Sequence, residues 1–112
     1  KALMHLSVLD LGENLLVGAI PEVIGDLHAL ESFYLQNNNL DGTLPTCIGL
    51  LLNLQNLYVN GNDLEGSIPR QFGNLENLRG LGLFENYLTG KIPTEIGKLK
   101  HLLVLYLDIN NL

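Results

Sequence analysis

The chain has 112 residues, with six lysines and arginines against twelve aspartates and glutamates, so its formal net charge is −6. That balance argues against a nucleic-acid binder, because phosphate contacts need a basic face. No apolar run approaches the roughly 20 residues of a membrane-spanning helix, and no basic segment followed by an apolar one predicts a signal peptide.

A segment of 24 residues repeats along the whole chain. The fifth copy stops before its Gly and Pro positions. The sequence therefore predicts a single repeat array, residues 1–112, in which each repeat buries its apolar edge against its neighbours. The template reads LxxLxxLxLxxNxLxGxIPxxIGx, and its copies begin at Leu3, Leu27, Leu51, Leu75 and Leu99.

Within one copy, the order of elements is strand, turn and short helix. In L-x-L the two apolar positions point one way and the middle residue points the other, which predicts one strand per repeat and a parallel sheet. The first Gly column, beginning at Gly18, suits a backbone position that a side chain would obstruct. Ile-Pro adds an apolar anchor beside a residue without an amide donor. The second Gly column, beginning at Gly25, follows an apolar helical turn and is interpreted as its stop signal.

An asparagine fills the turn after the strand in every copy. A buried amide can donate to and accept from the backbone groups that such a turn leaves unpaired. Stacked copies are therefore predicted to form a continuous, buried asparagine ladder. Its members are Asn14, Asn38, Asn62, Asn86 and Asn110.

The pattern resembles the plant-type leucine-rich repeat family over the whole chain. The motif that carries the resemblance is L-x-x-L-x-L-x-x-N-x-L with the extension L-x-G-x-I-P. The resemblance implies an α/β solenoid, a right-handed leucine-rich repeat horseshoe fragment. Its parallel β-sheet would line the concave face, and short helical turns, 3-10 or α, would line the convex face. Members of the family include receptor kinase ectodomains, receptor-like proteins and secreted polygalacturonase inhibitors.

The two ends of the array differ from its interior. Solenoid ends need a polar cap for solubility, and neither end of this sequence has one, which predicts an internal piece of a longer protein or a chain without its flanks. Apolar residues of the first and last copies would lose a stacking neighbour, so end-to-end self-association is expected. They are Leu6, Leu9, Leu11, Leu102, Leu105 and Leu107.

No catalytic or metal-binding constellation is visible in the sequence. His5 and His101 share one template position four repeats apart, which separates them by about 19 Å and prevents them from sharing a metal. No serine has a His and a carboxylate placed for a triad, and no glycine run resembles a phosphate loop. No histidine falls near Cys47 in the template, and Cys47 is interpreted as a partly exposed small residue. We therefore expect no enzyme, cofactor or metal.

Four columns of the concave wall are predicted to be free of structural duty: the residue before L-x-L, the residue inside it and the two residues after it. No lysine or arginine falls in these columns, so the partner is predicted to present a polar or basic face. The ligand-binding candidates are Asp10, Tyr34, Gln36, Tyr58, Asn60, Gly82, Phe84, Glu85, Tyr106 and Asp108.

Three of the four tyrosines fall in the column inside L-x-L. Tyr34 and Tyr58 are expected to stand one above the other, about 5 Å apart. Gly82 is expected to leave a notch between Tyr58 and Tyr106, with Phe84 at its border. Aromatic side chains with a polar tip around a gap are typical of a recognition hot spot. The alternative is that the tyrosines stack for strand stability alone.

The sequence leaves two classes of function open. The first is a protein or peptide recognition module that binds through the concave sheet, as part of a receptor-like ectodomain or, more narrowly, as a polygalacturonase-inhibitor-like secreted protein. The second is a structural spacer with no ligand of its own. The resemblance implies an extracellular or cell-surface location. The single cysteine and the lack of any N-x-S/T sequon leave an intracellular location open.

Overall fold

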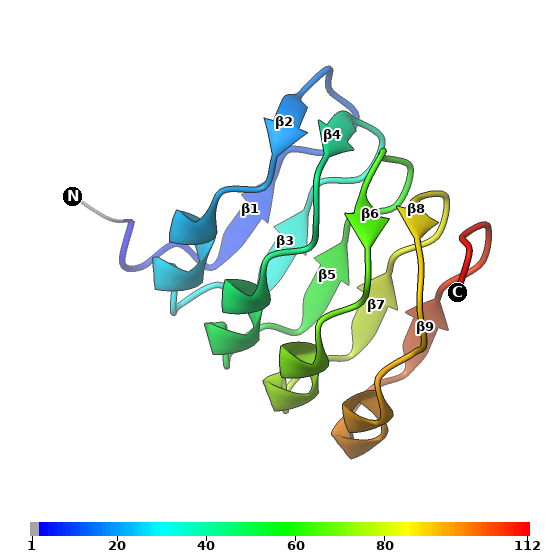
Figure 1. Cartoon of the computed structure of the whole chain (residues 1–112). Helices are drawn as coiled ribbons and strands as arrows, with labels where there is room; N and C mark the ends of the chain where they lie inside the picture. Colours follow the sequence, from blue (N-terminus) through cyan, green and yellow to red (C-terminus); the bar gives the residue numbers. More distant parts are fainter. Residues whose placement is uncertain (1–2) are drawn as a thin grey trace.

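The computed structural model describes residues 3–112, which form five stacked turns of a solenoid (Figure 1). Residues 1 and 2, which the predicted array includes, lie outside the described residues. One row of strands and one row of short helices run along the length of the array, so each repeat contacts its two neighbours. This is the arrangement that the 24-residue period predicts.

The main sheet has five parallel strands in the order β1-β3-β5-β7-β9. Paired residues are 24 positions apart, so that Leu9 faces Phe33 and Leu57 faces Leu81. The predicted strand at L-x-L and the parallel pairing are both confirmed. The strands are β1 (Val8–Asp10), β3 (Ser32–Tyr34), β5 (Asn56–Tyr58), β7 (Gly80–Gly82) and β9 (Val104–Tyr106).

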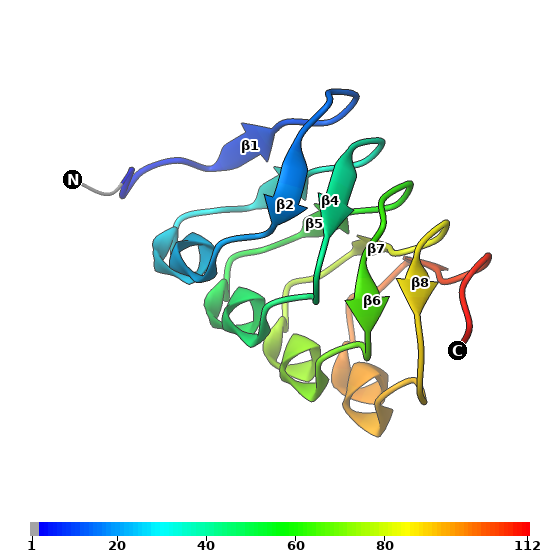
Figure 2. The ribbon, with the colours of Figure 1, turned by 45° about the horizontal axis from the view of Figure 1, so that its top comes forward.

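A second set of strands, which was not predicted from the sequence, follows the asparagine turn. The strand β2 (Val17–Ala19) pairs in parallel with β4 (Asn39–Asp41), and β6 (Glu65–Gly66) pairs in parallel with β8 (Tyr87–Leu88) (Figure 2). In β4 a buried Leu40 lies between two exposed residues, which is the alternation of a half-buried strand. The repeat therefore contributes to two sheets, one on each side of the asparagine turn.

Each of the first four repeats continues into a 3-10 helix of five residues. The proline of Ile-Pro stands immediately before the helix in an extended conformation. In the first repeat, Pro21 has φ −73° and ψ 142°, and its carbonyl accepts the Ile24 N–H at 3.1 Å. The proline thus sets the helix start. The helices are η1 (Glu22–Asp26), η2 (Thr46–Leu50), η3 (Arg70–Asn74) and η4 (Thr94–Lys98).

The core is a ladder of aliphatic and aromatic side chains between the strands and the helices. Leu57 and Leu81 from the main sheet and Phe72 from η3 are fully buried. Burial falls toward the ends of the array, where Leu9 is only half-buried and Leu105 is 39% exposed. Within the described residues, no helix has the length and apolar character needed to cross a bilayer.

The asparagine ladder is confirmed in its hydrogen bonds, and the prediction that all five members are buried is wrong at the ends. Asn38, Asn62 and Asn86 are 5–7% exposed, whereas Asn110 is half-buried and Asn14 is exposed. All five donate to backbone carbonyls. Burial of the side chain requires a repeat on each side, which the first and last copies lack.

The two glycine columns have different reasons. All four glycines of the first column have positive φ, which is their shared reason, since at Gly18 (φ +85°) a Cβ would meet nothing within 4 Å. The predicted obstruction occurs in part of the column, as at Gly66, where a Cβ would lie 3.0 Å from Cγ2 of Thr43. The second column lies inside the 3-10 helices, so the stop-signal interpretation is wrong. A Cβ on Gly49 would lie 2.6 Å from the carbonyl oxygen of Gln71, because the next helix packs directly against it.

Candidate functional site

The predicted tyrosine column exists on the main sheet. The strand register places Tyr34 beside Tyr58, Tyr58 beside Gly82, and Gly82 beside Tyr106. The rings of Tyr34 and Tyr58 stack, with centroids 5.9 Å apart and planes inclined by 26°. Residues next to them in the strands, such as Leu57, point into the core, so the tyrosines occupy the opposite face of the sheet.

The predicted notch at Gly82 is not open. The ring of Tyr58 leans over the next repeat, and a Cβ on Gly82 would lie 2.9 Å from Tyr58 Cε1. A Cβ on Gly80 would likewise lie 3.2 Å from Tyr58 Cε2. The absence of side chains at these two glycines provides the space, and Tyr58 fills it. Filling the notch with Gly82→Tyr would therefore require the Tyr58 ring to move.

This position changes the titration of Tyr58. Burial of the phenol raises its pKa above the ordinary value of 10.0, with further contributions from Tyr106 and Tyr34. Tyr58 therefore stays a neutral hydroxyl at physiological pH, able to donate and accept a hydrogen bond.

A shallow hollow of about 380 Å³ lies on this face, beside the Tyr58 ring. A smaller hollow of about 180 Å³ adjoins it, lined by Phe84, Tyr106 and Asp108. The rings of Phe84 and Tyr106 meet edge to face, 5.9 Å apart and at 87°. Seven of the ten predicted ligand-binding residues thus line one of two adjoining hollows. The larger hollow is lined by Tyr34, Gln36, Tyr58, Asn60, Phe84 and Tyr106.

The remaining three candidates do not line either hollow. Gly82 lies beneath the Tyr58 ring. Asp10 accepts the Gly12 N–H at 3.0 Å, so its carboxylate stabilises its own turn. Glu85 is exposed and has φ +52°.

The second column after L-x-L does have a structural duty, contrary to the prediction. All five of its residues adopt positive φ: Glu13, Asn37, Gly61, Glu85 and Ile109. The β-branched side chain of Ile109 at φ +54° is an outlier for that residue type. The turn before the ladder asparagine needs this conformation in every copy, so the column is only partly free to serve recognition.

One amide side chain that lines the larger hollow has an oxygen without a protein partner. Oε1 of Gln36 is buried and makes no hydrogen bond within the described part of the chain. Asn60 is only 7% exposed, although it was predicted as a surface contact. Buried polar groups are normally paired, so Oε1 of Gln36 is an exception.

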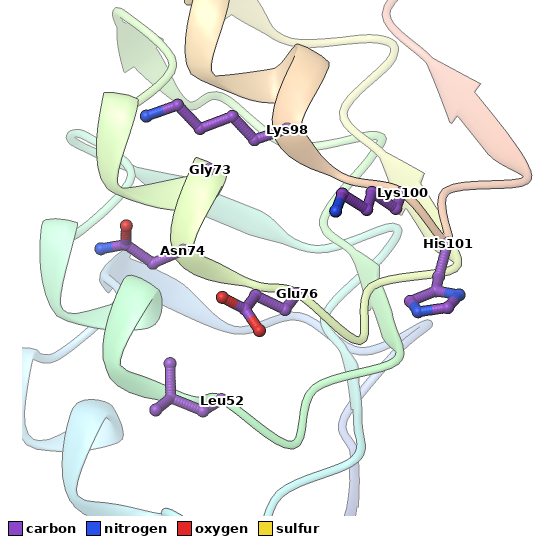
Figure 3. Close-up of a pocket in the computed structure, with 7 residues that line it drawn as sticks. All are labelled: Leu52, Gly73, Asn74, Glu76, Lys98, Lys100 and His101. Carbon is purple, nitrogen blue, oxygen red and sulfur yellow. The ribbon is translucent and has the colours of Figure 1, made fainter.

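Another hollow, of about 600 Å³, lies alongside the ends of η3 and η4 (Figure 3). Figure 3 shows Lys98, Lys100 and His101 on one side and Asn74 and Glu76 on the other. These residues were not predicted as a site, because all their template positions vary along the chain except the glycine column of Gly73. Every lining residue except the buried Gly73 is exposed. The hollow is therefore an open recess between neighbouring repeats. Its lining residues are Leu52, Gly73, Asn74, Glu76, Lys98, Lys100 and His101.

Cys47 is half-buried in η2, in agreement with its interpretation as a partly exposed residue. Burial, followed by a hydrogen bond and repulsion from Glu22, raises the pKa of its thiol from 9.0 to about 11. A thiol that stays protonated is a poor nucleophile. Within residues 3–112, no group of three His, Cys, Asp or Glu side chains is placed to hold a metal ion.

Comparison with known proteins identifies the repeat. A sequence profile for a leucine-rich repeat region matches residues 1–112. The chain belongs to the leucine-rich repeat family. This match and the plant receptor structures described next confirm the plant-type resemblance and the α/β solenoid with a concave parallel sheet. A search of curated protein sequences gives no match.

Solved structures similar to this leucine-rich repeat chain include plant receptors. The plant peptide hormone receptor RGFR1 in complex with RGF2 is 41% identical over 96% of this chain, with a TM-score of 0.94. The ectodomain of the Arabidopsis thaliana membrane receptor kinase GASSHO1/SCHENGEN3, in complex with CASPARIAN STRIP INTEGRITY FACTOR 2, is 42% identical over 93%, with a TM-score of 0.92. This chain covers only 17% and 13% of those receptor chains.

A plant ice-binding protein is also similar, at 33% identity over 91% of this chain and 34% of that protein, with a TM-score of 0.87. The same repeat thus occurs in proteins with different functions. Function must be argued from the exposed positions of this chain rather than from the repeat.

Proposed function

We propose that this chain is a peptide- or protein-recognition segment of a receptor-like ectodomain, and that it binds through the concave face around Tyr58. One observation carries the proposal. Aromatic rings and amides line a hollow of about 380 Å³ on a face of the sheet that points away from the core. Exposed aromatic anchors around polar groups are the usual material of binding hot spots.

The similar receptors support the class of partner. RGFR1 is described as a peptide hormone receptor in complex with RGF2, and at 41% identity its backbone closely matches that of this chain. A rigid sheet whose strands keep the same spacing offers a peptide the same kind of surface. The partner proposed here is accordingly a peptide or an extended protein segment.

The charges of this face support a partner that is polar or basic. Asp108 lines the smaller hollow, and Glu85 is exposed in the repeat that carries Phe84. No lysine or arginine lines either hollow among the described residues. A basic partner would be attracted, and an acidic one repelled.

The location proposed is extracellular or at the cell surface. GASSHO1/SCHENGEN3 is described as the ectodomain of a plant membrane receptor kinase. A chain of the same repeat type at 42% identity fits the same exposed setting. The aromatic hollow on the concave face supports recognition as the proposed role.

The spacer alternative is tested by separating binding from stability. Random peptides displayed on phage are selected against the chain, and the affinity of an enriched synthetic peptide is measured by calorimetry. Tyr58→Ala and Tyr106→Ala should each weaken binding by about 2 kcal/mol, or about 30-fold, as central aromatic anchors do. The control is Tyr87→Ala, which removes the same side chain from an exposed position of β8 outside the hollows.

Melting temperatures distinguish a recognition role of the tyrosines from a purely structural one. Recognition predicts that Tyr106→Ala melts like the parent protein, since its ring is 50% exposed, and yet loses the peptide. If no peptide is enriched, or if an enriched peptide binds the tyrosine variants as tightly as it binds the Tyr87→Ala control, the concave face is not the binding site.

A further inference from the structure

The smaller hollow combines two aromatic rings with a carboxylate. Its walls are the rings of Phe84 and Tyr106, and its third side is the carboxylate-bearing residue Asp108. Because the two rings are inclined by 87°, their π-faces point in different directions. A flat group can therefore lie on one ring while the other ring forms a side wall.

Two features of this hollow attract cations. The face of an aromatic ring attracts cations, and the carboxylate adds a full negative charge. No described lysine or arginine lines the hollow to neutralise that charge. A cation supplied by a partner would therefore meet favourable groups on three sides.

The adjoining larger hollow also includes a residue with an unpaired hydrogen-bond acceptor. Oε1 of Gln36 is a buried acceptor without a donor among the described residues. It lines the same hollow as Phe84 and Tyr106, so the two ends of the surface are continuous. The carboxylate-bearing Asp108 is exposed, so the N–H groups of a ligand reach it without any rearrangement.

We propose that the hollow of Phe84, Tyr106 and Asp108 is a subsite for an arginine side chain of the bound partner. The inference rests on the proposed recognition function and names the chemistry of one contact. Guanidinium is planar, stacks on aromatic rings, sheds its hydration more easily than ammonium and binds carboxylates through two parallel N–H groups.

The test uses a probe that carries only the feature in question. N-acetyl-Gly-Arg-Gly-amide is titrated into the 112-residue protein at low ionic strength, and the backbone amide signals of Tyr106 and Asp108 are followed by NMR. The comparison peptide has citrulline in place of arginine, which keeps the shape and removes the charge. The arginine peptide should bind about five-fold more tightly than the citrulline peptide.

Matched variants locate the effect. Asp108→Asn should reduce the affinity for the arginine peptide about five-fold and leave that for the citrulline peptide unchanged. Asp63→Asn makes the same change of charge at an exposed position outside the hollows and should change neither. Phe84→Leu should also weaken the arginine peptide, since an aliphatic side chain offers no π-face.

Three results would overturn the subsite: no saturable shift up to about 20 mM peptide, equal affinities for arginine and citrulline, or equal losses in Asp108→Asn and Asp63→Asn. These results leave the proposed function intact if a selected peptide still loses affinity on Tyr58→Ala. Conversely, arginine binding at Asp108 combined with unchanged peptide binding by the tyrosine variants would retain the subsite and reject the concave recognition face.

Discussion

At the residue scale, the asparagine ladder links each repeat to the one before it. Nδ2 of Asn62 donates to the carbonyls of Leu35 and Val59, both at 3.0 Å. Its Oδ1 accepts the N–H of Leu40 at 3.0 Å. Leu35 and Leu40 belong to the preceding repeat, so one amide satisfies backbone groups on two neighbouring turns of the solenoid. Only an amide can donate and accept in this way.

Replacement of a central ladder residue should therefore be costly. Asn62→Asp should lower the free energy of unfolding by about 1–3 kcal/mol, because a carboxylate cannot donate to the two carbonyls that it faces. The same replacement at the exposed Asn14, whose Nδ2 bonds only to carbonyls of its own repeat, should cost less. Urea denaturation followed by circular dichroism measures both. Equal stabilities of the Asn62 variant and the parent protein would refute the ladder.

The thiol of Cys47 gives a pH-dependent prediction. Its raised pKa, about 11 against an ordinary 9.0, means that at pH 8 the folded protein should react with iodoacetamide about 100-fold more slowly than the urea-unfolded protein. Because the unfolded thiol ionises first, raising the pH from 9 toward 11 favours the unfolded state. Mass spectrometry of the alkylated protein gives the rates.

Glu22 tests the cause of that shift. Glu22→Gln should lower the pKa of Cys47 and leave it above 9.0, because burial is the largest contribution and the carboxylate adds to it. Glu76→Gln, at an exposed position, is the control. Folded protein that reacts as fast as unfolded protein at pH 8 would show that the thiol is not shielded.

The sequence predicted which residues share a column far better than how their side chains lie. A fixed period places Tyr34, Tyr58 and Tyr106 at one strand position, because the register follows the repeat. The period carries no information on χ angles, so it could not show that Tyr58 leans over Gly82. A column of Glu, Asn, Gly and Ile likewise gave no sign of positive φ, because only one of its members is glycine.

At the scale of elements, the close stacking of the 3-10 helices depends on the second glycine column. In each of the first three helices, a Cβ on this glycine would approach the backbone of the next helix to 3.0 Å or less. Gly97 of η4 differs, since a Cβ there would meet nothing within 4 Å. From the sequence, this glycine column was interpreted as a stop signal of its own helical turn. The structure shows instead a contact between residues 22 positions apart, Gly49 and Gln71.

The two situations predict opposite effects of one substitution. Gly49→Ala should destabilise by about 1–3 kcal/mol, because its Cβ would collide with the main chain at Gln71. Gly97→Ala has free space and an ordinary φ, and should stabilise by about 0.4–1 kcal/mol through the unfolded state. Thermal denaturation of both variants measures the difference. Two changes of the same sign would show that packing between helices does not explain the column.

At the scale of the whole molecule, charge is distributed unevenly along the array. Residues 1–69 contain eight carboxylates and one lysine, a net charge of −7, whereas residues 70–112 contain four carboxylates and five lysines or arginines, a net charge of +1. The two ends of the described array also expose core positions, with Leu11 at 38% and Leu105 at 39%. One end is therefore acidic and apolar, and the other is weakly basic and apolar.

These ends predict head-to-tail association of the 112-residue protein. The outer edge of β9 in one copy can pair with the outer edge of β1 in the next, which buries the exposed leucines of both. Such a contact joins two different surfaces and does not close, so it should produce a series of oligomers rather than a discrete dimer. Sedimentation velocity at increasing concentration should therefore show a continuous rise in the average mass.

Two lysine substitutions distinguish head-to-tail association from unspecific aggregation. Leu105→Lys places a charge on the β9 end and should shift the protein toward monomer, as charged residues do on natural sheet edges. Leu52→Lys makes the same change at an exposed position of a central repeat and should leave the association unchanged. A protein that stays monomeric at millimolar concentration, or that stops at a dimer, contradicts the head-to-tail mode. Equal effects of the two lysines would mean that the exposed leucines associate without regard to the ends of the sheet.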